Sequence, residues 1–151
     1  MTLDVFCFKE NELYGSELPE TIADLEQLSK MGIKVIISLE DAILNLKHHS
    51  SLEQNFEHHE LFITDYDIPN EEQVEEFLNI VEKAMKEKKP VLVHCYAGCG
   101  RTGVMLALVE KILYKTEDGL KAIANLRKVR PCSVESKNQQ EFVKSYKRKK
   151  E

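Results

Sequence analysis

The sequence, 151 residues long, lacks the features that mark linkers, repeats and membrane segments. It has no stretch rich in glycine, serine or proline, no internal repeat and no low-complexity segment. No run of apolar residues approaches the roughly 18 that a membrane span needs. We therefore expect one domain over residues 1–151, large enough to bury a core, and no membrane association.

Cysteine is scarce, and its spacing is not typical of a disulfide framework or a redox motif. Cys7, Cys95, Cys99 and Cys132 form no Cys-x-x-Cys pair, and the N-terminus carries no charged and apolar export signal. Reduced thiols in a cytoplasmic protein are therefore the expected state.

Positive charge is not in excess either, because the formal net charge is −5. An acidic chain has little nonspecific affinity for nucleic acid or anionic lipid, and the basic segment 144–150 is interpreted as a solvated helix face. The pairs His48-His49 and His58-His59 do not predict a metal site, because adjacent histidines point apart on a helix and no acidic residue or cysteine has ligand spacing. We expect solvated histidines, no metal and no cofactor.

Apolar residues follow the periodicities of strands and helices in alternation. Strands are predicted at residues 5–8 and 12–14, which would form a hairpin, and at 33–39, 61–63 and 91–93. Helices are predicted from Pro19 to Gly32 with Ile22, Leu25 and Leu28 on one face, from an Asn70–Gln73 capping box to Pro90, over 104–109, over 116–127, and from Ser136 to the C-terminus. This order predicts an α/β fold, with a central, largely parallel sheet flanked by helices on both faces.

The most informative segment joins the strand at 91–93 to the helix at 104–109. It reads His94-Cys95-Tyr96-Ala97-Gly98-Cys99-Gly100-Arg101-Thr102-Gly103. A loop of small residues that opens a helix can direct its N–H groups inward, and the helix N-terminus adds about half a positive charge. A phosphate-sized dianion fits such a cup, and the same field, with Arg101 nearby, stabilises the thiolate form of Cys95. The sequence thus predicts a nucleophile inside an anion-binding loop, with the guanidinium holding two oxygens.

This segment is the signature of the cysteine-dependent phosphatases, His-Cys-x5-Arg-Ser/Thr-Gly, and the chain resembles the small atypical dual-specificity phosphatases of the protein tyrosine phosphatase superfamily. The likeness extends to residues 12–16, 35–39, 65–69 and 129–135. It implies the protein tyrosine phosphatase fold and a phosphocysteine intermediate, with Cys95 as nucleophile and Arg101 as phosphate clamp. The phosphate would be bound by Tyr96, Ala97, Gly98, Cys99, Gly100 and Arg101.

A general acid is expected in the segment Asp65-Tyr66-Asp67-Ile68-Pro69. Such a residue gives a proton to the leaving oxygen and, as carboxylate, then activates water. The family pattern Asp-x-x-x-Pro favours Asp65, and Asp67 is the alternative. Asp67 is also explained as a turn residue, because Asp readily bonds its own backbone in turns.

Four further residues have both a functional and a structural interpretation. Thr102 can donate its hydroxyl to the leaving Cys95 sulfur, or it can cap the helix. By the family resemblance His94 orders the loop and favours the thiolate, although an ordinary core histidine is the alternative. Gln139 matches a glutamine that positions water in related enzymes, but Ser136 and Gln139 also form a capping box. Glu135 is a candidate for the pocket rim.

Three further features concern the surroundings of the loop. Glu40 and Asp41 are candidates to hold Arg101 from behind. Where relatives carry Arg-Pro-Gly, this chain has Arg130-Pro131-Cys132, so a turn that favours a positive φ would hold a non-glycine residue. Cys99 raises the possibility of a disulfide that traps oxidised Cys95, although a residue four places along a curled loop is expected to point away.

The predicted function is hydrolysis of phosphotyrosine in proteins, and of phosphoserine or phosphothreonine if the cleft is shallow. Phosphorylated proteins or peptides are the expected partners, and the chain is expected to be a monomer. The alternatives are the same chemistry on RNA 5′ phosphates or phosphoinositides, a noncatalytic phosphate-binding module, and a thiol redox or sulfur-transfer enzyme. A loop without lysine argues against substrates with several phosphates, and the presence of Cys95, Arg101 and Asp65 argues against the noncatalytic module.

Overall fold

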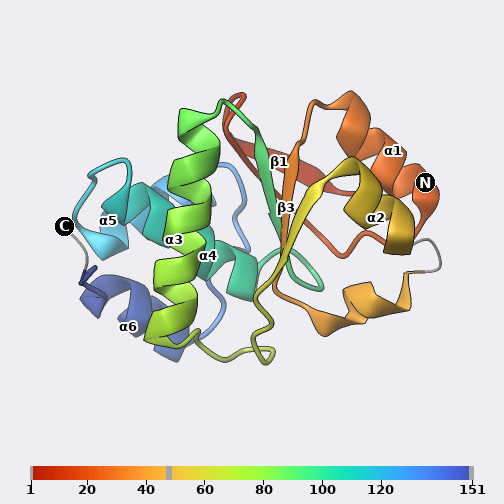
Figure 1. Cartoon of the computed structure of the whole chain (residues 1–151). Helices are drawn as coiled ribbons and strands as arrows, with labels where there is room; N and C mark the ends of the chain where they lie inside the picture. The colour runs from red at the N-terminus through yellow and green to blue at the C-terminus, as the bar shows by residue number, and fades with distance from the viewer. Residues whose placement is uncertain (1, 47–48, 150–151) are drawn as a thin grey trace.

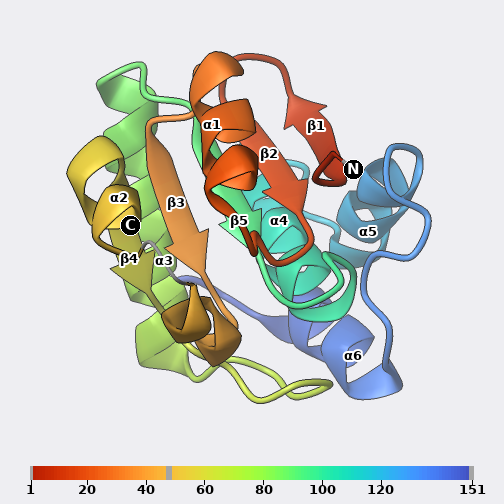
Figure 2. The same ribbon diagram turned by 90° about the vertical axis from the view of Figure 1, so that its right-hand side faces the viewer.

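The computed structural model describes residues 2–46 and 49–149 and is built on a five-stranded sheet (Figures 1 and 2). The strand order is β1-β2-β5-β3-β4. The first two strands, β1 (Val5–Lys9) and β2 (Leu13–Ser16), form the antiparallel hairpin that the sequence predicts. The other neighbours run parallel, namely β2 with β5 (Val91–His94), β5 with β3 (Val35–Ser38), and β3 with β4 (Glu57–Glu60). The α/β fold with a largely parallel sheet is confirmed.

Helices cover both faces of the sheet. One face carries α1 (Ile22–Lys30), the short 3-10 helix η1 (Asp41–Asn45) and α2 (His49–Asn55), and the other carries α3 (Glu71–Lys86), α4 (Gly100–Ile112), α5 (Gly119–Arg127) and α6 (Lys137–Ser145). Side chains alternate along the central strands, so Ile36 and Leu92 pack on the first face and Val35, Val91 and Val93 on the second. No helix in the described part of the chain is both long and apolar enough to cross a bilayer.

Helix starts follow the capping signals in the sequence. The N–H of Gln73 donates to Asn70 Oδ1 at 2.8 Å, and the N–H of Asn70 donates back to Gln73 Oε1 at 2.9 Å, so the predicted box opens α3. The first helix begins at Ile22 instead of Pro19, because Thr21 and Asp24 form its capping box. Of the three residues predicted on one face, Leu25 and Leu28 are buried, whereas Ile22, at the start of the helix, is 40% exposed.

The fourth strand lies earlier than predicted. Residues 61–63 are not a strand, and β4 is instead the polar segment just before them, which includes His58 and His59. This strand is at the edge of the sheet, where one side is unpaired and polar side chains are tolerated. Leu61 and Ile63 are buried, but they continue past the strand, where their N–H groups donate to the carbonyls of Ser38 and Leu39.

The C-terminal segment does not form the solvated helix face that the sequence predicts. The last helix ends at Ser145, and the residues after it lie against α3. Tyr146 donates its hydroxyl to Glu75, Arg148 pairs with Glu82 at 2.7 Å, and Lys149 pairs with Glu71 at 2.6 Å. Charge complementarity with an acidic helix thus fixes this segment, up to residue 149.

Helix α4 is buried along nearly its whole length, between the sheet and the last two helices. Lys111, near its end, is 8% exposed although it is charged. Its ammonium donates to the carbonyls of Val143, Lys144 and Tyr146, at 2.9, 3.0 and 2.7 Å. The side chain therefore caps the C-terminal end of α6 and ties that helix to α4.

Replacing Lys111 with Met should destabilise the protein by about 2 kcal/mol, because three carbonyls lose their donor while the length of the side chain is kept. Urea unfolding of Lys111→Met measures this loss. Lys121→Met, at an exposed position of α5, is the control. Equal free energies of unfolding for the two variants would contradict the capping role.

Candidate active site

Cys95 follows the last residue of β5, at the carboxyl end of the sheet, and is 3% exposed. The carbonyls of the next four residues are all held from outside the loop. The N–H of Leu18 donates to Tyr96 O, Arg130 donates to Ala97 O and Gly98 O, and the N–H of Val134 donates to Cys99 O. In a trans peptide the N–H points opposite to the C=O, so the N–H groups of residues 97–100 point into the loop. The loop is an inward-facing set of donors at the start of α4.

Gly98 allows the loop to curl against β2. Its φ is +78°, in the left-handed region that favours glycine. A Cβ atom there would lie 2.7 Å from the backbone carbonyl of Ser16. The loop therefore needs glycine at this position for both conformation and space.

Arg101 is 3% exposed and is held by two segments of the chain, Glu40 after β3 and residues 63–65 after β4. Its Nη2 atom pairs with Glu40 Oε1 at 2.8 Å, and its Nη1 atom donates to Ile63 O at 2.8 Å. Asp65 Oδ1 lies 3.4 Å from Nη2. The Nε atom of Arg101 is buried without a hydrogen-bond partner among the described residues, and so is the hydroxyl of Thr102. Two donors therefore remain for an anion held by the loop.

The carboxyl group of Glu40 is the anchor for Arg101, as the sequence suggested. Burial alone raises the pKa of Glu40, but the N–H of Ala42 and the Arg101 guanidinium outweigh this effect and leave the pKa below its ordinary value. Glu40 is therefore ionised at neutral pH. The pair borders a hollow of about 300 Å³, which Asp41 and Asp65 also line.

The two candidate acids have different surroundings. Asp67 accepts the N–H of Ile68 at 2.8 Å, and its own N–H donates to Thr64 O, as expected for a turn residue. Asp65 accepts the N–H of Tyr66 at 3.0 Å, but it also lies beside Arg101. The structure therefore brings Asp65, and not Asp67, to the guanidinium, while 56% of its side chain stays exposed to solvent.

A chain of hydrogen bonds supports the loop from behind. His94 is fully buried, and its Nδ1 atom lies 2.9 Å from Cys95 O. Its Nε2 atom lies 2.6 Å from the hydroxyl of Ser38, which lies 2.7 Å from Nε2 of His58. Burial lowers the pKa of His94 to about 4, so the ring is neutral at pH 7 and orders the loop through its hydrogen bond, without a net charge.

Sequence reasoning missed Ser38 and His58. The signal for Ser38 is its register, because it is the last residue of β3 and pairs with His94 of β5. The signal for His58 depended on the position of β4, which was predicted too late in the chain.

The sequence and the fold are similar to those of known phosphatases. A family model described as "Polymorphic toxin system, DSP-PTPase phosphatase" matches residues 14–115. The chain belongs to the DSP-PTPase family of phosphatases. The "Dual specificity protein phosphatase CDC14B" of Mus musculus is 34% identical over 130 residues, 86% of this chain and 25% of that protein. The chain thus spans about a quarter of the length of the CDC14 proteins it matches.

Shorter relatives and solved structures match over most of their length. The "Probable protein tyrosine phosphatase type IVA B" of Dictyostelium discoideum is 29% identical over 144 residues, 89% of this chain and 82% of that protein. The crystal structure of Tk-PTP in its active form has a TM-score of 0.81 and 25% identity over 93% of each chain. That of PTPMT1 with PI(5)P has a TM-score of 0.82 and 18% identity, over 93% of this chain and 92% of that one. The protein tyrosine phosphatase fold is confirmed.

In this DSP-PTPase domain Gln139 is fully buried and closes the capping box of α6. Its Oε1 atom accepts the N–H groups of Glu135 and Ser136, at 2.8 and 3.1 Å. Its Nε2 atom donates to Asp67 O at 3.3 Å, so the same side chain also reaches the segment 65–69, which holds both candidate acids. Glu135 is exposed beside Gly100, at the rim of the anion-binding loop.

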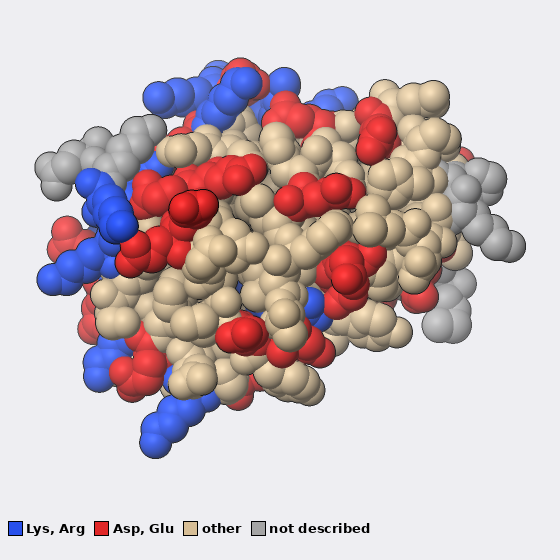
Figure 3. All heavy atoms as spheres, turned by 60° about the horizontal axis from the view of Figure 1, so that its bottom comes forward, with Lys and Arg blue, Asp and Glu red and all other residues tan. Residues whose placement is uncertain are grey.

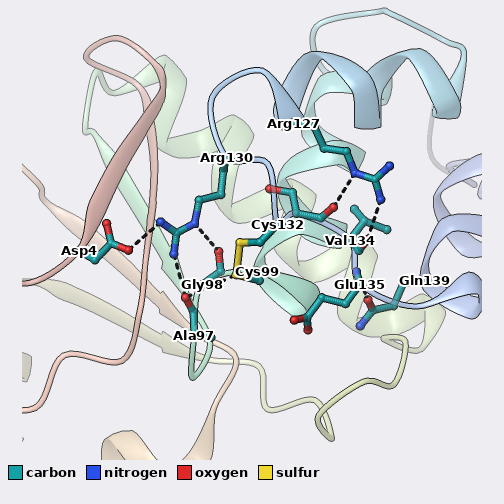
Figure 4. The surroundings of a disulfide bond; sticks show 11 residues. Asp4, Ala97, Gly98, Cys99, Arg127, Arg130, Cys132, Val134, Glu135 and Gln139 are labelled. Atoms are coloured by element: carbon teal, nitrogen blue, oxygen red, sulfur yellow. Dashed lines mark hydrogen bonds and ion pairs between the residues drawn. A yellow bond between two sulfur atoms is a disulfide. The ribbon is translucent and has the colours of Figure 1, made fainter.

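The expectation of four reduced cysteines is wrong. Cys99 forms a disulfide with Cys132, with their Cα atoms 5.2 Å apart (Figure 4). Cys7 and Cys95 are free, and in this state Cys99 has no thiol with which to trap oxidised Cys95. Cys132 lies 33 residues from Cys99 in sequence, and no short motif predicts a disulfide across such a separation. Cys132 stands where relatives carry glycine, but it does not have the positive φ that this position suggested. The residue with a positive φ in this turn is Val134, at 64°.

Arg130 fastens the loop to the N-terminal hairpin. Its Nη2 and Nε atoms donate to the carbonyls of Ala97 and Gly98, at 2.9 and 3.3 Å, and Nη1 pairs with Asp4 at 2.7 Å (Figure 4). The guanidinium also lies over the ring of Phe6, 4.9 Å from its centroid. That ring in turn occupies the space beside Gly15, where a Cβ atom would lie 2.3 Å from it. Gly15, Phe6 and Arg130 form a stack behind the loop, which we call the Arg130 stack.

Peptide mapping of protein purified without reductant should find Cys99 linked to Cys132, with Cys7 and Cys95 alkylated by iodoacetamide. After treatment with dithiothreitol all four thiols should be alkylated, which serves as the control. A Cys95–Cys99 peptide in the untreated sample would contradict this assignment.

Proposed function

We propose that the chain is a cysteine-dependent phosphatase that hydrolyses phosphotyrosine, and also phosphoserine and phosphothreonine, in proteins. Cys95 Sγ bonds to phosphorus while the bond from phosphorus to the leaving oxygen breaks, and Asp65 gives that oxygen a proton. In the second step Asp65 takes a proton from water, whose oxygen bonds to phosphorus as the S–P bond breaks. The hydroxyl of Thr102 donates to the departing thiolate.

The observation that carries this proposal is the set of donors without partners around the loop. Arg101 Nε and Thr102 Oγ1 are buried without hydrogen bonds in the described part of the chain, and the N–H groups of residues 97–100 point inward. Unsatisfied buried donors cost free energy, and a phosphoryl group would satisfy them. The same donors can stabilise the charge that spreads over its oxygens in the transition state.

The charge around the site favours a protein with a single phosphate over a phosphoinositide. Acidic side chains spread over the face at the carboxyl ends of the strands, while most basic ones lie towards its margin (Figure 3). Near the loop, Glu40, Asp41 and Asp65 line one hollow, and Glu135 lies beside Gly100. Additional phosphates on an inositol ring or on an RNA 5′ end would be repelled there. The likeness to PTPMT1, at 18% identity, supports the fold alone.

Replacing Cys95 with Ser should reduce turnover of phosphotyrosine peptide by roughly four to six orders of magnitude, as the loss of a nucleophile does in other covalent enzymes. Tungstate binding should remain, because Arg101 and the N–H groups are unchanged. Arg101→Lys should instead weaken the affinity for tungstate by about ten- to a hundredfold, since one ammonium group does not replace the planar guanidinium with its two parallel N–H donors.

The substrate class is tested on the wild-type protein with matched concentrations of phosphotyrosine, phosphothreonine, phosphoinositide and RNA 5′-triphosphate substrates. Higher kcat/KM on either phosphopeptide is the expected result. Faster release of phosphate from phosphoinositide or RNA would overturn the choice of substrate, whereas turnover by Cys95→Ser within tenfold of wild type would overturn the mechanism.

Asp65→Asn should lower kcat by roughly two to three orders of magnitude on substrates with poor leaving groups, because the leaving oxygen then departs without a proton. An aryl phosphate with an activated leaving group should lose much less. Asp67→Asn is the matched control, since it changes the same loop but not the side chain beside Arg101. If only Asp67→Asn shows this dependence on the leaving group, the acid is two residues further along the loop.

A further inference from the structure

Outside the catalytic loop, the fold brings together two histidines and a glutamate that the sequence placed apart. His49 begins α2 and Glu53 lies one turn later, while His58 comes from β4. Ligand atoms of the three residues all lie within 4.8 Å of one another, and the rings of His49 and His58 are 5.9 Å apart between centroids. The expectation of solvated histidines is therefore wrong for His49 and His58, whose partly buried rings pack against each other. His48 lies outside the described residues.

The hydrogen-bonding state of His49 is unusual for a surface histidine. Its Nε2 atom is buried without a hydrogen-bond partner among the described residues, and the nearest carboxylate oxygen, from Glu60, is 3.9 Å away. His59, the neighbour of His58 in the same strand, has its Nε2 atom 2.7 Å from Glu57 and needs no other partner. The cluster thus holds a ring nitrogen, Nε2 of His49, that makes no hydrogen bond with any residue the structure describes.

The chain of hydrogen bonds behind the loop determines which ring nitrogen of His58 carries the proton and which has a free lone pair. Cys95 O can only accept, so the neutral ring of His94 must carry its proton on Nδ1 and accept at Nε2. The hydroxyl of Ser38 therefore donates to His94, and it must accept from Nε2 of His58. His58 then has its proton on Nε2 and a lone pair on Nδ1. A second hydrogen bond that fixes the tautomer in this way is typical of histidines that bind metals.

We propose that His49, Glu53 and His58 bind a divalent transition-metal ion of the zinc type. Two imidazoles and one carboxylate are ligands that Zn²⁺ prefers, and they leave a fourth position for water or Glu60. The i, i+4 spacing puts His49 and Glu53 on one face of α2, and the edge strand β4 supplies the third ligand. The site does not depend on the proposed reaction.

Zinc binding is measured by calorimetry on the full chain with Cys7→Ser and Cys95→Ser, without reductant, so that no free thiol competes for the ion. We expect one Zn²⁺ per chain. His49→Ala, Glu53→Gln and His58→Ala should each weaken its affinity by about tenfold or more, and His59→Ala, the matched control, should not change it. Glu53→Gln is nearly isosteric and exposed, so its result does not depend on refolding.

Two results would overturn the site. One is the absence of saturable binding in the protein without free thiols, and the other is a loss of affinity in His59→Ala as large as in His58→Ala. The tautomers provide a test without metal, by NMR of ¹⁵N-labelled histidine. The ring proton of His58 is expected on Nε2 and that of His94 on Nδ1, and the opposite assignment for His58 would remove its lone pair from the cluster.

Discussion

The burial of the Arg101 charge is the constraint on which the site depends. A guanidinium cannot lose its proton in a protein, so its removal from water costs several kcal/mol unless partners surround it. Here the partners come from two segments far apart in sequence. Glu40 follows β3, and residues 63–65 after β4 supply the carbonyl of Ile63 and the carboxyl group of Asp65. The terminal nitrogens of Arg101 therefore have their partners only when β3 and the segment after β4 are in place around α4. The same contacts that stabilise the charge also bring the carboxyl group of Asp65 to the guanidinium.

Arg101 uses only part of its hydrogen-bonding capacity within the protein's described residues, which leaves a donor for an anion. The terminal nitrogens are held by the protein, whereas Nε remains unpaired among the described residues. The side chain is thus oriented before any anion arrives, and a substrate does not have to order it. The second support, the chain from Cys95 O through His94 and Ser38 to His58, restrains the other end of the loop. The loop is held from β3, β4, α4 and the segment around Arg130.

Local patterns were sufficient to predict the elements and the chemistry of this site. The capping boxes at Asn70 and Ser136, the central strands and the loop from His94 to Gly103 are encoded in neighbouring residues, and the structure has them where the sequence predicts them. The position of β4 could not be predicted in the same way, because an edge strand with polar side chains lacks the apolar signal of the central strands. The Cys99–Cys132 disulfide and the contacts of Arg130 depend on segments more than thirty residues apart, whose approach only the fold determines. The His49–His58 cluster depended on the same misplaced strand.

The Arg130 stack has a consequence for how this sequence can change over evolution. Gly15 leaves the space that the Phe6 ring fills, and the ring supports the guanidinium that holds Ala97 O and Gly98 O. A larger residue at position 15 requires a smaller side chain at position 6. A smaller side chain there would no longer contact the guanidinium of Arg130. Positions 6, 15 and 130 should therefore covary among homologous sequences, although none of them touches the reacting atoms and the last is far from the other two along the chain. Substitutions in the β1–β2 hairpin would then be selected by their effect on the loop that follows β5, the strand beside β2.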